Sequence, residues 1–111
     1  MNFSKLNDRI SVAGQLEPDD MVHVYSQGFR TIICNRPDNE GPGQPSFAQI
    51  KAAASAAGLA AFYIPIVPGR AGRAEVSAFA DAINSQPGPV LAYCRSGARS
   101  TAIYDAVRAK A

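Results

Sequence analysis

Apolar and polar positions alternate along the chain in two rhythms that predict strands and helices in turn. Short apolar or β-branched runs predict strands, and apolar residues recurring every three or four positions predict helices. The expected strands cover residues 8–15, 30–34, 60–66 and 89–93, and the expected helices run over 18–27, 46–57, about 74–85 and the segment that carries Ile103 and Val107. The first strand follows a polar start, so we expect it at an edge of the sheet.

Strand and helix in strict alternation predict an α/β fold. Parallel strands joined by helices require right-handed crossovers, which put helices on both faces of the sheet. We therefore expect one domain over residues 1–111, with three layers and a mostly parallel sheet of four to five strands. Ligands bind beyond the carboxyl ends of such strands, so three loops should meet at one end. These loops bring candidate residues around Cys94, namely Cys34, Arg36, Asp38, Arg70 and Arg73.

The stretch 89–101 places a thiol at the start of a helix. The first N–H groups of a helix lack partners within it, and its dipole favours negative charge. Beside Arg95 and Arg99, the pKa of Cys94 should fall from about 8.5 into a range of about 3.5–7.5. A buried core cysteine is the simpler interpretation, but it leaves two guanidinium groups and two hydroxyls around one sulfur unexplained. We predict a thiolate nucleophile in an anion-binding loop formed by Arg95, Ser96, Gly97 and Ala98.

Composition and charge argue against several classes of protein. A net charge of +2 is too small to indicate binding to nucleic acid or a charged membrane. No signal peptide or membrane span is expected. Two cysteines without an export signal predict a reducing cytoplasm and chemistry rather than a disulfide. The one histidine, His23, is expected at the surface or as a satisfied core residue rather than as a catalytic one. One histidine and no Cys-x-x-Cys spacing predict neither a metal nor another cofactor. The sequence does not indicate an oligomeric state.

Four stretches together resemble a known family over nearly all of the chain. They are Ile10-Ser11-Val12-Ala13-Gly14-Gln15-Leu16, Asn35-Arg36-Pro37-Asp38, Tyr63-Ile64-Pro65-Ile66 and Tyr93-Cys94-Arg95-Ser96-Gly97-Ala98-Arg99-Ser100. The chain resembles the family described as beta-lactamase hydrolase-like protein, phosphatase-like domain, whose members include phosphatases and sulfur transferases. The resemblance implies a fold similar to that of dual-specificity tyrosine phosphatases and a cysteine-dependent activity.

Loop spacing favours sulfur transfer over phosphate hydrolysis. Cysteine phosphatases place five residues between cysteine and arginine, whereas four separate Cys94 from Arg99, as in the similar loop of rhodanese sulfurtransferases. Phosphatases of the dual-specificity kind also take an aspartate general acid from the preceding loop, and residues 67–73 contain no carboxylate. Persulfide transfer needs no general acid, because its thiolate product leaves readily. Asp38 or Glu40 could supply the acid, although turn capping is their simpler role.

The resemblance also implies roles for single residues. Cys94, Arg99 and Ser100 are the expected catalytic residues, and the Ser100 hydroxyl should donate a hydrogen bond to the Cys94 sulfur. The expected partners are a small anionic sulfur donor with a thiol acceptor, or a phosphorylated substrate. Cys34 could relay sulfur, although a core role is simpler. Two non-enzymatic alternatives remain, an anion-binding pseudo-enzyme and a redox sensor in which Cys34 captures oxidised Cys94.

Overall fold

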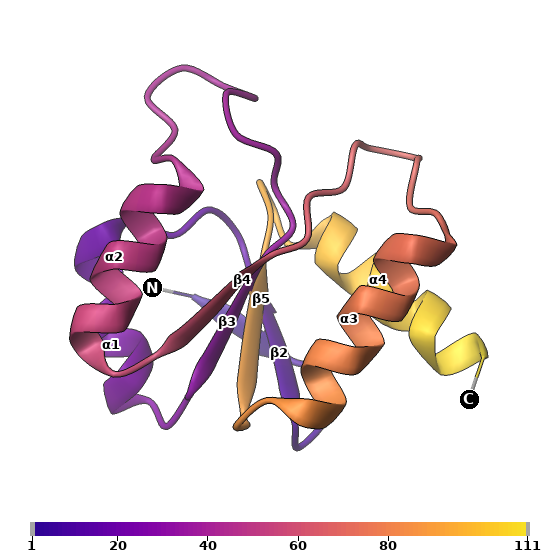
Figure 1. The fold of residues 1–111 in the computed structure, drawn as a ribbon, viewed down its shortest axis with the longest axis horizontal. Helices are drawn as coiled ribbons and strands as arrows, with labels where there is room; N and C mark the ends of the chain where they lie inside the picture. Colours follow the sequence, from indigo (N-terminus) through magenta and orange to yellow (C-terminus); the bar gives the residue numbers. More distant parts are fainter. Residues whose placement is uncertain (1, 111) are drawn as a thin grey trace.

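A computed structural model describes residues 2–110 and shows one five-stranded sheet with helices on both faces (Figure 1). The strands are β1 (Phe3–Lys5), β2 (Ile10–Ala13), β3 (Thr31–Cys34), β4 (Ala60–Tyr63) and β5 (Val90–Tyr93). The helices are the 3-10 turn η1 (Pro18–Asp20), α1 (Met21–Ser26), α2 (Phe47–Ala57), α3 (Arg73–Ser85) and α4 (Ala98–Ala109). The predicted three-layer α/β fold with a mostly parallel sheet is confirmed.

Strand order in the sheet is β1-β2-β5-β3-β4, and every pairing except β1 with β2 is parallel. The predicted edge position of β2 is wrong, because its four residues are buried and it pairs on both sides. The edge is taken by β1, whose three residues are all exposed. Such a short, polar strand has no periodic pattern of its own and exists through its pairing with β2.

The hydrophobic core has two halves, one on each side of the sheet. Alternating side chains of β5 point to opposite faces, as a strand requires. Ala92 packs with Phe79 and Ile103 on the side of α3 and α4, whereas Leu91 packs with Ile50 on the side of α1 and α2. Figure 1 shows these two helix pairs on opposite sides of the sheet. This arrangement buries β5 at the centre, so the residues that follow it start from a rigid support.

The ends of α2 lie where the sequence predicts them, whereas the apolar residues of the first helix are buried only in part. Ser46 caps α2 by accepting a hydrogen bond from the Gln49 N–H at 3.2 Å, and Gly58 ends the helix with a φ of 93°. The apolar residues of the helix predicted over 18–27 are buried only in part, since Val22 and Tyr25 are exposed. Its first turn is the 3-10 turn η1, which changes the angular spacing of the side chains that follow.

The strand predicted over 60–66 ends earlier, at Tyr63. Pro65 lies between two residues that still bond toward β3, and at this edge of the sheet its missing N–H costs no ladder bond. The Ile64 N–H donates to the carbonyl of Cys34, the last residue of β3, at 2.9 Å. The Ile66 N–H donates to the carbonyl of the next residue, Asn35, also at 2.9 Å. Within residues 2–110, no helix is both long and apolar enough to span a membrane.

Candidate active site

Cys94 lies directly beyond β5, at the base of a tight loop that leads into α4. Its side chain is buried, with only 1 % of the residue exposed. The Gly97 N–H donates to the Cys94 sulfur at 3.0 Å. Gly97 has a φ of 95°, a conformation that glycine adopts without steric cost and that turns the loop back over the sulfur. The loop also lies close to the end of β2, where a Cβ on Gly14 would come within 3.1 Å of the Arg95 carbonyl oxygen.

Backbone amides surround the Cys94 sulfur and favour its anionic form. Burial of the thiol raises the pKa of Cys94, but this is outweighed by N–H groups of the loop and the first turn of α4. The net effect is a pKa below the ordinary value. The groups responsible belong to Ser100, Ser96, Arg99 and Gly97. Those of Arg99 and Ser100 are free N–H groups of the first turn of α4, and the other two belong to the loop before it, so the arrangement agrees with the thiolate expected from the sequence.

We predict that the two cysteines titrate in separate steps. The pKa of Cys94 is lowered by the surrounding amides, whereas burial raises the pKa of Cys34. The ultraviolet absorbance of thiolate, followed against pH, should therefore show one step below the ordinary cysteine value of about 8.5 and a second step above it. The lower step should vanish in Cys94→Ser. A lower step that persists in that variant would contradict the assignment.

A cavity of about 660 Å³ opens beside the loop and is rich in positive charge. Its walls come from the loops after β3, β4 and β5, which meet at one end of the sheet as predicted. The lining residues are Arg36, Glu40, Gly41, Pro42, Pro68, Arg95 and Arg99. Arginine binds planar oxyanions with paired donors, and this cavity holds three such side chains. It is therefore suited to a small anion.

Glu40 joins two of these arginines. The Arg99 guanidinium donates to both carboxylate oxygens of Glu40, at 2.6 and 2.7 Å, and Arg36 Nε donates to one of them at 3.0 Å. A further bond from Arg99 reaches the Ile66 carbonyl at 2.9 Å. The bond from Arg99 is the main cause that lowers the pKa of Glu40, so this carboxylate stays ionised. In this arrangement Glu40 holds the arginines in place and has no proton to give.

The Ser100 hydroxyl has a different partner from the one expected. It donates to Asn35 Oδ1 at 2.8 Å, and both residues are completely buried. A hydroxyl carries one proton, so in this arrangement it is not donated to the Cys94 sulfur. The backbone N–H of Ser100 takes that role instead. Ser100 thus serves the sulfur through its main chain and serves Asn35 through its side chain.

Cys34 belongs to the core on the side of α1 and α2, together with Tyr93. Its thiol donates to the Arg36 carbonyl at 3.3 Å. Cys94 lies beyond the end of β5, and its sulfur accepts from the Gly97 N–H of the loop. The two sulfurs therefore have different surroundings, one in the core and one in the loop. This placement favours the core role of Cys34 and gives no support to its capture of oxidised Cys94.

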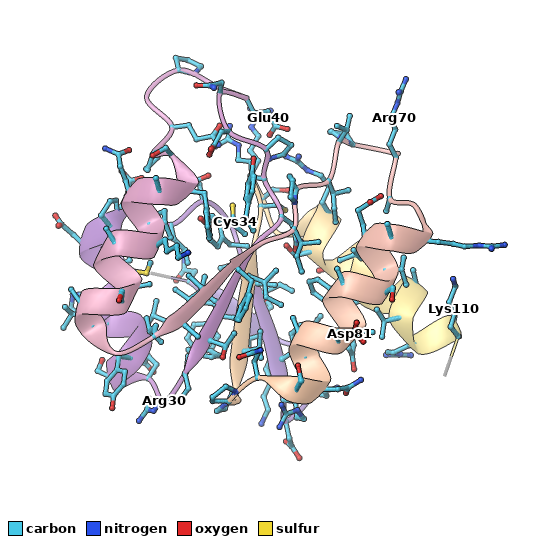
Figure 2. All side chains as sticks on the ribbon, viewed as in Figure 1. Arg30, Cys34, Glu40, Arg70, Asp81 and Lys110 are labelled. Atoms are coloured by element: carbon cyan, nitrogen blue, oxygen red, sulfur yellow. The ribbon has the colours of Figure 1, made fainter. Side chains whose placement is uncertain are left out.

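The remaining predicted residues lie apart from the cavity or serve the fold. Asp38 Oδ1 accepts a hydrogen bond from the Phe47 N–H at 2.8 Å, which satisfies a free amide at the start of α2. Arg70 and Arg73 are exposed and do not line the cavity. Figure 2 shows Arg70 pointing away from the sheet, whereas Glu40 lies above its carboxyl end. His23 is exposed, which is one of the two placements expected for it.

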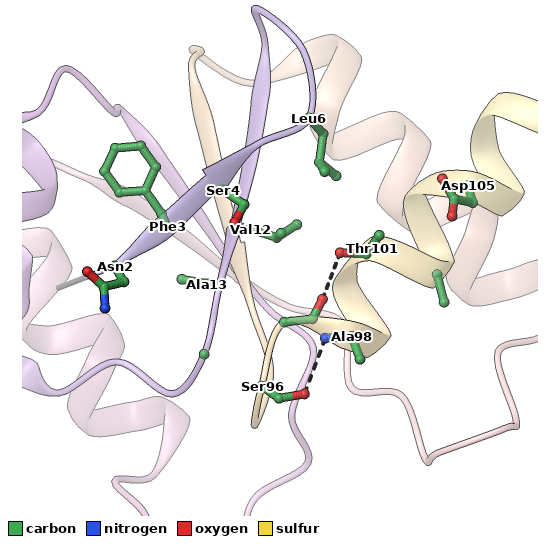
Figure 3. A pocket seen from close by; sticks show the side chains of 13 residues that line it. Asn2, Phe3, Ser4, Leu6, Val12, Ala13, Ser96, Ala98, Thr101 and Asp105 are labelled. Atoms are coloured by element: carbon green, nitrogen blue, oxygen red, sulfur yellow. Dashed lines mark hydrogen bonds between the residues drawn. The ribbon is translucent and has the colours of Figure 1, made fainter.

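A second hollow, of about 630 Å³, lies on the other side of the loop, between β1 and the start of α4 (Figure 3). There the Thr101 hydroxyl donates to the Gly97 carbonyl at 2.9 Å, which fixes the turn into the helix. Its lining includes no arginine or lysine, and its one charged side chain is that of Asp105. The two hollows therefore differ in charge, and the one beside Arg99 is the one suited to an anion.

Sequence reasoning gave too little weight to three residues. Asn35 binds Ser100, Glu40 holds Arg36 and Arg99, and Gln15 Oε1 accepts from Arg36 at 3.0 Å. Asn35 could have been found, because a polar residue directly after a buried β-branched strand needs a partner. The pairing of Glu40 with Arg99 spans 59 positions, and no local pattern indicates it.

Comparison with known proteins identifies relatives over the whole described chain. The family described as "Beta-lactamase hydrolase-like protein, phosphatase-like domain" matches residues 2–111. A beta-lactamase hydrolase-like protein of Agrobacterium fabrum is 38 % identical over 104 residues, which cover 94 % of this chain. The chain spans only about a quarter of that protein, 24 % of its length.

Solved structures show the same fold. A candidate phosphatase from Neisseria meningitidis is 37 % identical, with a TM-score of 0.88 over 96 % of this chain and 75 % of the other. TpbA of P. aeruginosa, solved in complex with phosphotyrosine, superposes with a TM-score of 0.68 at 15 % identity. That match covers 92 % of this chain and 59 % of the other. At such low identity the likeness shows the fold alone, which is that of a tyrosine phosphatase.

Proposed function

Since the chain belongs to the family described as beta-lactamase hydrolase-like protein, phosphatase-like domain, we propose that it is a cysteine-dependent enzyme that transfers sulfur through a persulfide on Cys94. The observation that carries the proposal is the short loop, in which only four residues separate Cys94 from Arg99. The amides of this loop and of the first turn of α4 converge on one sulfur. A persulfide anion is smaller than a phosphate and suits this tighter ring of donors.

The proposed reaction has two displacements at sulfur. The Cys94 thiolate attacks the sulfane sulfur of a small anionic donor, a new S–S bond forms, and the donor leaves with the electron pair of the broken bond. A thiol acceptor, as its thiolate, then attacks the outer sulfur of the Cys94 persulfide. The outer sulfur passes to the acceptor, and Cys94 returns as a thiolate. Amides, Arg95 and Arg99 would stabilise the anion at each stage.

Sulfur transfer is favoured because its chemistry needs no proton donor. Thiolates and sulfur oxyanions leave without protonation, whereas an alkoxide does not. Residues 67–73 contain no carboxylate, and Glu40 is held ionised by Arg99. Asp38 binds the start of α2. In phosphate ester hydrolysis, the lack of a general acid typically costs about 10²–10⁴-fold in rate.

Phosphate hydrolysis is the second candidate, and the structural relatives favour it. TpbA binds phosphotyrosine in its solved complex, and the relative from Neisseria is described as a candidate phosphatase. By analogy, Cys94 would attack phosphorus and form a phosphocysteine, which water would then hydrolyse. The same cavity arginines would hold a phosphorylated substrate. No cofactor is needed for either reaction, and the free thiols suit a reducing compartment such as the cytoplasm.

Intact mass measurement separates the two reactions. The reduced protein is incubated with thiosulfate or polysulfide, and its mass is compared with that of Cys94→Ser treated in the same way. We expect the wild type to gain the mass of one sulfur atom, to lose it again with a thiol, and the variant to gain nothing. If the wild type gains no sulfur but releases phosphate from an aryl phosphate, the function is phosphate hydrolysis and not sulfur transfer. An adduct retained in Cys94→Ser would move the persulfide to Cys34.

A further inference from the structure

Asn35 is a completely buried polar residue at the centre of the active-site end of the sheet. Its backbone N–H donates to the Tyr93 carbonyl at 2.8 Å, and its carbonyl accepts from the Ile66 N–H at 2.9 Å. Its side-chain amide donates to the Ile64 carbonyl at 2.9 Å and accepts from the Ser100 hydroxyl at 2.8 Å. One residue therefore connects the chain after β3, β4 and β5 with the first turn of α4.

The bond to Ser100 holds one residue of the first turn of α4, whose backbone N–H acts on the Cys94 sulfur. Ser100 is the third residue of the helix, so its N–H has no partner within the helix. The position of that N–H depends on how the first turn is held, and the buried hydroxyl of the same residue is tied to Asn35. Because β3 is a central strand of the sheet, Asn35 gives this turn a rigid anchor.

We propose that Asn35 is a positioning residue for the reaction at Cys94: it holds the Ser100 hydroxyl and so keeps the first N–H groups of α4 directed at the sulfur. The inference rests on the proposed function only in taking Cys94 as the reacting atom. It holds whether the group carried on that sulfur is sulfane sulfur or phosphate. Asn35 itself touches neither the substrate nor the sulfur.

Two variants remove the hydrogen bond between Ser100 and Asn35, one from each partner. Asn35→Ala removes the acceptor, and Ser100→Ala removes the hydroxyl while it keeps the backbone N–H. Each should raise the pH midpoint of the Cys94 thiolate by about one unit, because an amide that drifts from the sulfur no longer stabilises its charge. The double variant should shift the midpoint no further than the larger single shift, because both changes break the same bond. Arg99 and, through it, Glu40 are the charged groups coupled to this sulfur, and both are kept in every variant.

Thr31→Val is the matched control. Thr31 lies at the other end of β3, is completely buried, and donates to the Pro87 carbonyl at 2.6 Å. Its loss removes one buried hydrogen bond from the same strand, so the melting temperature should fall while the thiolate midpoint stays at the wild-type value.

The readout is the thiolate absorbance titration, which needs no substrate. Unchanged or lowered midpoints in both Asn35→Ala and Ser100→Ala would overturn the proposal and leave Asn35 with a purely structural role. If Asn35→Ala does not fold, Ser100→Ala alone decides by the same criterion. Raised midpoints in a protein that takes up no sulfur from thiosulfate would support the positioning role and reject sulfur transfer. The two proposals can therefore fail separately.

Discussion

Replacement of Cys94 by serine should abolish activity, with a loss of at least about 10⁴-fold in kcat/KM, while the fold is kept. A hydroxyl fits the space of the thiol, but at neutral pH it does not ionise in a ring of amides, and it forms no persulfide. The loss should apply equally to sulfur transfer from thiosulfate and to hydrolysis of an aryl phosphate. Rates with both substrates measure the effect, and a thermal melt checks the fold.

Cys34→Ala is the control for this prediction. Cys34 lies in the core, and its thiol donates to the Arg36 carbonyl. Its loss should lower the melting temperature, because a buried hydrogen bond and part of the packing are removed, and should leave the reaction at Cys94 in place. Activity retained in Cys94→Ser and lost in Cys34→Ala would exchange the roles of the two cysteines.

The order of elements could be predicted from sequence because each central strand is continuously apolar and each helix has its own end signals. Ser46 and Gly58 bound α2, in agreement with the predicted range 46–57. Edge strands carry less information, since β1 is short and exposed and is defined by its pairing with β2. Regular pairing in β4 ends at Tyr63, although the N–H groups of Ile64 and Ile66 still bond toward β3, and no local signal in the sequence marks that end.

The residues of the candidate site that lie close together in the sequence could be predicted. Cys94, Gly97 and Arg99 fall in one loop, and helix-start physics indicates a thiolate there. What the sequence does not show is which distant groups satisfy the arginines and the buried hydroxyl. Glu40 reaches Arg99 from a loop on another strand, and Asn35 takes the hydrogen bond expected to go from Ser100 to the sulfur. Such choices follow from packing in three dimensions.

Arg99→Lys should lower kcat/KM by about 10²–10³-fold, the cost of losing one donor to a developing anion. The planar guanidinium binds both oxygens of Glu40 and the Ile66 carbonyl at once, and it also interacts with Cys94. A lysine carries a point charge and lacks this fork of donors, so it cannot keep all of these contacts. The rate of persulfide formation from thiosulfate, measured by mass against time, reports the effect.

Arg108→Lys is the matched control for Arg99→Lys, because it makes the same change on the exposed end of α4. It should leave the rate unchanged. If Arg99→Lys reacted at a near-normal rate while its melting temperature fell, the role of Arg99 would be to hold the loops through Glu40 and Ile66. A slow reaction in a protein that still unfolds cooperatively, even at a somewhat lower melting temperature, would instead show that the guanidinium acts on the reacting anion, which is the outcome that the cavity's charge leads us to expect.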